Sequence, residues 1–187
     1  TLCALAPHLS ESQRAKTLTE TLNVIKTIID ESALADALGR LAPYLSDDLM
    51  KETLGIVRVI GHEGSRVDAL GALASHLSGD LINEALGIVH NIGHGFFRAS
   101  ALCVLIPYLP ENERINALVE ALFAAHTLSD EATRAAMLHT LVPHLTVLTS
   151  QQPQYSYLAF SETLPTLAAY PRPQFLNDLA ALMPFIL

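Results

Sequence analysis

Apolar residues recur along this chain at spacings of three and four, and one apolar phrase returns five times. The phrase is LCALAPHLS first, then LGRLAPYLS, LGALASHLS, LCVLIPYLP and LHTLVPHLT. Its leucines stand five and two positions before a proline column and two positions after it, so they share one helix face. The pattern predicts five amphipathic helices, one for each member of the column: Pro7, Pro43, Ser75, Pro107 and Pro143.

A second phrase alternates with the first, as TIIDE, VIGHE, NIGHG and TLSDE. The proline column is spaced by 36, 32, 32 and 36 residues, and the stretch from the second phrase to the next proline is always 15. An insertion of four turns a helix by about 400°, which preserves its apolar face. We therefore expect repeats of 32 or 36 residues, each a pair of antiparallel helices. The predicted fold is all-α, an α-solenoid similar to HEAT and tetratricopeptide superhelices.

Polar residues at fixed positions predict the helix ends. The first helix of a pair is expected to open on Ser46 or Ser78, and the second on a column of capping residues. The proline late in the second helix is expected to end or bend it, with Ser75 as the exception. The capping column holds Asp30, His62, His94 and Asp130.

The repeats cover residues 1–145 and begin in the middle of a repeat. After Leu145 the pattern lapses: TVLTSQQPQ is predicted to be a loop, and residues 146–187 a degenerate C-terminal helical unit. Repeats bury their apolar faces only against neighbours and need polar capping units at the ends. The apolar start and end therefore predict a larger parent protein.

The phrases LAPHLS, LAPYLS and IIDES, the column Arg66, Arg98 and Arg134, and the closing YPRPQFLNDLAALMPFI resemble a degenerate αα-repeat of large bacterial multidomain proteins. Those proteins are similar to the STAND class of signal-transducing nucleotide hydrolases, with NB-ARC or NACHT engines. The resemblance implies that this chain is a sensor or scaffold region. No GxxxxGK[ST] motif occurs in it, so no nucleotide cofactor is expected here.

Charge, apolar run length and cysteine content limit the classes of partner and the cellular compartment that we expect. The chain has 11 basic and 19 acidic residues, a net charge of -8, and no basic cluster, so nucleic acid is not expected. No apolar run approaches the roughly 18–20 residues that cross a bilayer, so no membrane is expected. The two cysteines favour a reducing compartment, and we expect a cytoplasmic protein.

Three arginines, Arg66, Arg98 and Arg134, recur in the first turn of the second helix. Arg66 and Arg134 could pair with Glu63 and Glu131, three residues earlier, or the row could hold an acidic peptide segment in a groove. Arg98 has Gly95 in place of the acid and is predicted to be the most available.

Flat rings follow the proline column, where Tyr44 and Tyr108 alternate with histidines. They are predicted either to form a ladder packed between repeats or to offer a ligand-stacking surface. A column of mostly small residues four positions before the proline, which includes Gly39 and Cys103, predicts close helix contact with Cys103 buried.

No catalytic residue is predicted. His90 and His94 stand four apart, but no Cys or acid completes a ligand set, and no metal site is expected. The function hypothesis is non-catalytic binding of a protein or peptide, through a candidate groove that includes Arg66, Arg98, Arg134, Tyr44 and Tyr108. The alternatives are an enzyme or a nucleic-acid-binding solenoid with a site in its groove, and a structural spacer.

Overall fold

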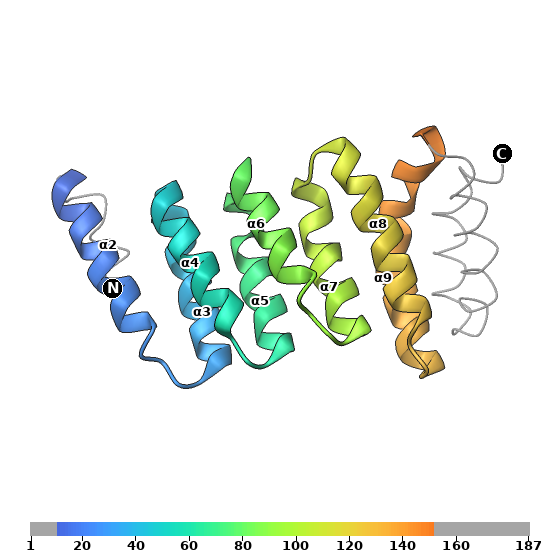
Figure 1. Ribbon diagram of the computed structural model, residues 1–187, viewed down its shortest axis with the longest axis horizontal. Coiled ribbons are helices and arrows are strands. Elements are labelled where there is room, and N and C mark those ends of the chain that lie inside the picture. The colour runs from blue at the N-terminus through green and yellow to red at the C-terminus, as the bar shows by residue number, and fades with distance from the viewer. Residues whose placement is uncertain (1–10, 152–187) are drawn as a thin grey trace. The chain divides into compact units, whose positions relative to one another are not determined.

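The computed structural model describes residues 11–151, and the predictions for residues 1–10 and 152–187 lie outside the described residues (Figure 1). Within the described range every regular element is a helix, and no strand occurs. This confirms the all-α prediction. The chain divides into two compact units, unit 1 at residues 1–92 and unit 2 at residues 93–187.

The helices follow the predicted order. Unit 1 contains α2 (Glu11–Ile25), α3 (Glu31–Leu41), α4 (Asp47–Val59), α5 (Glu63–Leu73) and α6 (Asp80–Val89). Unit 2 contains α7 (Gly95–Leu105), α8 (Glu111–His126) and α9 (Glu131–Gln151). Short 3-10 helices follow α3, α5 and α7, at Ala42–Tyr44 (η2), Ala74–His76 (η3) and Ile106–Tyr108 (η4).

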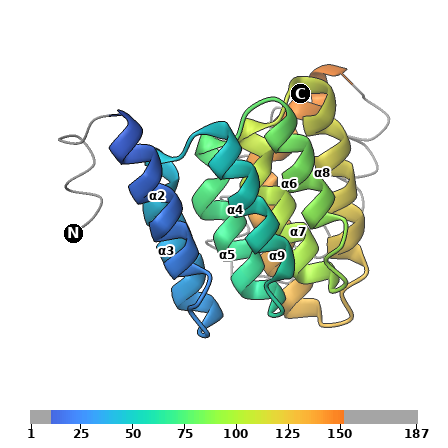
Figure 2. The same ribbon diagram turned by 60° about the vertical axis from the view of Figure 1, so that its left-hand side comes forward.

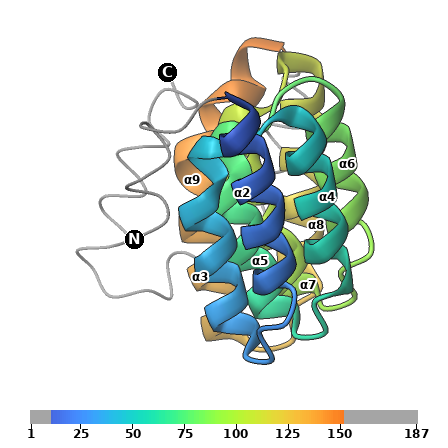
Figure 3. The same ribbon diagram turned by 90° about the vertical axis from the view of Figure 1, so that its left-hand side faces the viewer.

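Unit 1 consists of two layers of helices. In one layer α3 lies along α5, and in the other α4 lies along α6, as Figure 3 shows from the end of the unit. The close approach of α3 and α5 depends on Gly39, because a Cβ there would lie 2.6 Å from the Cβ of Ala72. The predicted close contact at this column is confirmed at Gly39.

The helix α2 is placed differently from the other helices of its layer. It packs on α3 and stands away from α4, whereas α4 and α6 are neighbours (Figures 1 and 2). Its apolar side chains Leu18, Leu22 and Ile25 are buried, but Val24 is 67% exposed. The corresponding residue of α4, Ile56, is only 8% exposed, so α2 leaves uncovered a position that α4 buries.

In unit 2, α7 packs against both α8 and α9. A Cβ at Gly95, the first residue of α7, would lie 2.9 Å from Oγ1 of Thr127 and 3.0 Å from the carbonyl oxygen of Ala124. Glycine at this position therefore allows the start of α7 to approach the end of α8.

The predicted leucine stripe forms much of the core. Leu38, Leu70, Leu102 and Leu138 are completely buried, and their partners three residues later are at most 3% exposed. The third leucine of the phrase varies: Leu77, Leu109 and Leu145 are buried, whereas Leu45 is half-buried. Burial of one leucine contributes about 1.5–3 kcal/mol, so the stripe is a major source of stability.

The capping column behaves as the sequence predicts. Oδ1 of Asp30 accepts a hydrogen bond from the amide of Ala33 at 2.8 Å, and Nδ1 of His62 accepts one from the amide of Ser65 at 3.1 Å. The predicted start of the first helices is confirmed at α4, where Ser46 is the N-cap, although its side chain makes no cap bond. It is wrong at α6, where the N-cap is Gly79 instead of Ser78. Gly79 has φ +53°, a conformation that glycine adopts without steric strain.

Proline has a smaller effect on the second helices than predicted. The α-helix ends before Ser75 in the same 3-10 turn as before Pro43 and Pro107. Pro143 lies inside α9, which continues to Gln151. The predicted loop after Leu145 is therefore wrong for residues 146–151: Pro143 removes one amide donor, and the following residues keep helical hydrogen bonding. The rest of the 146–187 unit lies outside the described residues.

Candidate functional site

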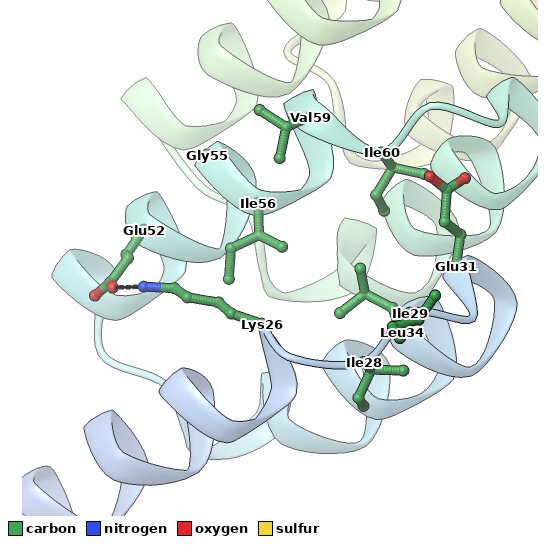
Figure 4. A pocket seen from close by; sticks show the side chains of 10 residues that line it. All are labelled: Lys26, Ile28, Ile29, Glu31, Leu34, Glu52, Gly55, Ile56, Val59 and Ile60. Atoms are coloured by element: carbon green, nitrogen blue, oxygen red, sulfur yellow. Dashed lines mark hydrogen bonds and ion pairs between the residues drawn. The ribbon is translucent and has the colours of Figure 1, made fainter.

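A groove of about 510 Å³ opens in unit 1, where the connection between α2 and α3 faces α4 (Figure 4). Its volume lies in the range of about 300–1,000 Å³ that is typical of ligand sites. The α2–α3 connection and the start of α3 form one wall, and the last two turns of α4 form the other. The lining residues are Lys26, Ile28, Ile29, Glu31, Leu34, Glu52, Gly55, Ile56, Val59 and Ile60.

The middle of the groove is apolar and open to solvent. Ile29 is 95% exposed and Val59 is 78% exposed, while Ile56 and Ile60 beside them are buried. A single exposed apolar side chain is ordinary, but here two of them line one hollow. The groove therefore offers branched apolar side chains on both of its walls.

Gly55 lies in the interior of α4 and lines the groove, and a Cβ added there would meet nothing within 4 Å. Glycine inside a helix costs about 0.8–1.0 kcal/mol relative to alanine. No neighbour among residues 11–151 requires this glycine. Its effect is to leave the α4 backbone uncovered at the groove.

An ion pair stands at one end of the groove, where Nζ of Lys26 lies 2.5 Å from Oε1 of Glu52 (Figure 4). The same pair recurs 32 residues later, between Arg58 of α4 and Glu84 of α6 at 3.5 Å. Exposed pairs contribute about 0–1 kcal/mol. The first ion pair joins the end of α2 to α4, and the second joins the end of α4 to α6.

The carboxylate of Glu31 lies beside Ile60 at the other end of the groove (Figure 4). Its oxygens accept hydrogen bonds from the amides of Gly61 at 2.8 Å and His62 at 2.7 Å. These two bonds, with smaller contributions from the nearby His62 and Arg66 charges, lower the pKa of Glu31 below its ordinary 4.5. Glu31 thus carries a negative charge at neutral pH and joins the start of α3 to the start of α5.

Stability should depend on pH through Glu31. Because its folded pKa is lowered, its contribution is complete above the ordinary pKa of 4.5 and is lost as the pH falls through the folded value. A Glu31→Gln variant is expected to unfold at lower urea concentration than wild type at neutral pH, with the difference shrinking below pH 4.5. Asp36→Asn, in the same helix, is the control. A constant difference across the acid range would contradict this expectation.

The predicted arginine row is directed at backbone carbonyls. Nε and Nη2 of Arg66 donate to the carbonyl of Ile60 at 3.1 and 2.5 Å, and Nη1 of Arg134 donates to that of Leu128 at 2.9 Å. Both bonds tie the guanidinium to the turn between the two helices of a pair.

Arg98 lies beside an acid of the neighbouring helix. Its Nε lies 3.9 Å from Oε1 of Glu120 on α8, and its side chain is 30% exposed. Gly95 removes an acid from its own helix, but the neighbouring helix supplies one. None of Arg66, Arg98 and Arg134 lines the groove of unit 1.

The rings after the proline column are on the surface. Tyr44 is 38% exposed in η2 and Tyr108 is 45% exposed in η4, and neither lines the groove. His76 in η3 is exposed too, so the predicted packed ladder is wrong for these residues because the 3-10 turn directs them outward. Cys103 is buried as predicted, and burial raises the pKa of its thiol to about 12.

His90 and His94 do not share a helix, because α6 ends at Val89. His90 follows α6 as its C-cap, and His94 is the N-cap of α7. The two residues therefore do not lie one turn apart on a single helix face.

Sequence reasoning missed the groove, although one signal for it was present. Ile29 occupies the position that Gly61 and Gly93 hold in the next two repeats. The sequence thus places a large apolar residue at a position where the next two repeats have a glycine. The splaying of α2 from α4 has no counterpart in the sequence pattern.

Comparisons with protein-family models, curated proteins and solved structures find no match for this chain. Across residues 11–151, none of the helices combines the length and the apolar character that crossing a membrane would require.

Proposed function

We propose that this chain is a non-catalytic α-solenoid segment that binds a peptide or a protein segment in the groove of unit 1. Its repeats of 32 or 36 residues stack as helix pairs, and the segment serves as a sensor or scaffold region of a larger cytoplasmic signalling protein of the STAND class. The observation that carries the proposal is the groove with exposed Ile29 and Val59 over an uncovered stretch of α4.

The exposed side chains of the groove support binding over a purely structural spacer. A spacer gains nothing from the exposed side chains of Ile29 and Val59, which would be more stable if covered. Such exposure is expected where a ligand supplies the missing contacts.

Filling the groove from inside should abolish binding without unfolding the protein. Gly55→Leu adds a side chain in open space and replaces a poor helix former, so the variant should be slightly more stable than wild type. A phage-displayed library of random linear peptides, selected on the wild-type protein, should yield clones that bind Gly55→Leu at least about tenfold more weakly, which corresponds to about 1.4 kcal/mol.

Gly87→Leu is the matched control. Gly87 holds the place of Gly55 one repeat later, lies in α6, has nothing within 4 Å of an added Cβ, and does not line the groove. Selected clones should bind this variant as they bind wild type. If no clone is enriched, or if clones bind Gly55→Leu as well as Gly87→Leu, the groove is not the binding site.

A further inference from the structure

We infer that the ligand of the groove is a peptide segment in which a branched apolar side chain stands next to a lysine or an arginine. The inference rests on the proposed function and adds the chemistry of the partner. The apolar side chain lies between Ile29 and Val59 above Gly55, and the basic group meets the carboxylate of Glu31.

The apolar half of this inference follows from the walls of the groove. Ile28 and Ile29 stand on one side and Ile56 and Val59 on the other, and Gly55, on the same helix as Ile56 and Val59, adds no side chain to that wall (Figure 4). Burial of apolar surface contributes about 25 cal/mol for each Å² removed from water. A branched aliphatic side chain would contact both walls and reach the backbone of α4 at Gly55.

The basic half follows from the charges. The groove is lined by two carboxylates, Glu31 and Glu52, and by one ammonium group, Lys26. Lys26 and Glu52 neutralise each other in a direct ion pair, which leaves the charge of Glu31 as the excess. Arg66 lies close enough to act on Glu31, but its guanidinium is directed at the carbonyl of Ile60, and Arg66 does not line the groove.

Glu31 can accept a further donor. A carboxylate offers about four acceptor positions, and the amides of Gly61 and His62 use two of them. The formal charge of unit 1 is negative, like that of Glu31, because residues 1–92 contain 7 basic and 12 acidic residues, which gives -5. Such a field attracts basic partners, and the attraction weakens as salt is added.

The test uses the isotope-labelled protein and three synthetic peptides, with binding followed by the amide signals of Gly55 and its neighbours. One peptide has an Ile-Val core between lysines, the second has glutamates in place of the lysines, and the third has serines in place of Ile-Val. The lysine peptide should shift the signals of the groove, and less so at higher ionic strength. The other two should shift them at least several-fold more weakly at the same concentration.

Glu31→Gln and Asp36→Asn separate the charge at the groove from the overall charge of unit 1. Both remove one carboxylate of α3, but Asp36 does not line the groove. The lysine peptide should lose about two- to fivefold in affinity on Glu31→Gln, as for an exposed ion pair, and less on Asp36→Asn.

Equal binding of the lysine and glutamate peptides, or equal loss in the two variants, would overturn the inference. It would leave the proposed function intact, since the library selection against Gly55→Leu contains peptides of every charge. Shifts with the serine peptide equal to those with the lysine peptide would also overturn it, because they would show that the apolar core contributes nothing.

Discussion

Leu73→Asp is expected to abolish the cooperative unfolding transition of unit 1. Leu73 is completely buried in α5, which packs along α3. Loss of a buried leucine costs about 2–5 kcal/mol, and an unpaired carboxylate in its place costs more. Since folded proteins of ordinary size are stable by only about 5–15 kcal/mol, this change should consume most of the stability. Urea titration followed by far-ultraviolet circular dichroism measures it.

Two variants calibrate that result. Leu73→Ala should lower the free energy of unfolding by about 2–5 kcal/mol and leave a folded protein. Ser75→Asp places the same carboxylate on an exposed position two residues later and should change stability by no more than about 0.5 kcal/mol. A Leu73→Asp variant with the urea midpoint of wild type would show that the leucine stripe is not the core.

Gly39→Val is expected to destabilise unit 1 by about 1–3 kcal/mol, the usual cost of overpacking. Its Cβ would lie 2.6 Å from that of Ala72, so α3 and α5 must move apart. The loss is expected despite the better helix propensity of valine, which favours the variant by a few tenths of a kcal/mol. The urea midpoint and the slope of the transition provide the measurement.

A double variant distinguishes steric contact from any other effect at Gly39. Ala72→Gly removes the opposing Cβ, so Gly39→Val combined with Ala72→Gly should lose less stability than the two single changes added together. Gly87→Val, in open space on α6, should be neutral or slightly stabilising. Additive losses in the double variant would contradict a direct contact between the two helices.

The sequence predicts the helices well because their signals are local. The leucine spacing that places Leu38 and Leu70 on one face depends only on helix geometry, and both are completely buried. The cap at Asp30 likewise depends on residues three positions apart. Where a signal involves one helix and its own termini, the sequence is sufficient.

The candidate site could not be predicted because its geometry is not local. The acceptor of Arg66 is the carbonyl of Ile60, a group that every residue possesses and that no pattern of side chains marks. The partner of Arg98 is Glu120, 22 residues away on another helix. The groove depends on how far α2 stands from α4, which is decided by packing between helices and not by either helix alone.

The turn at Ser75 shows where the prolines of the other repeats act. The 3-10 helix at Ala74–His76 forms without proline, whereas its counterparts at Ala42–Tyr44 and Ile106–Tyr108 contain Pro43 and Pro107, so the folded geometry does not require the ring. A proline at such a position restricts the backbone of the unfolded chain and stabilises by about 0.4–1 kcal/mol through that ensemble. The proline column thus raises the free energy of the denatured state, and the repeat with Ser75 folds from a looser starting ensemble.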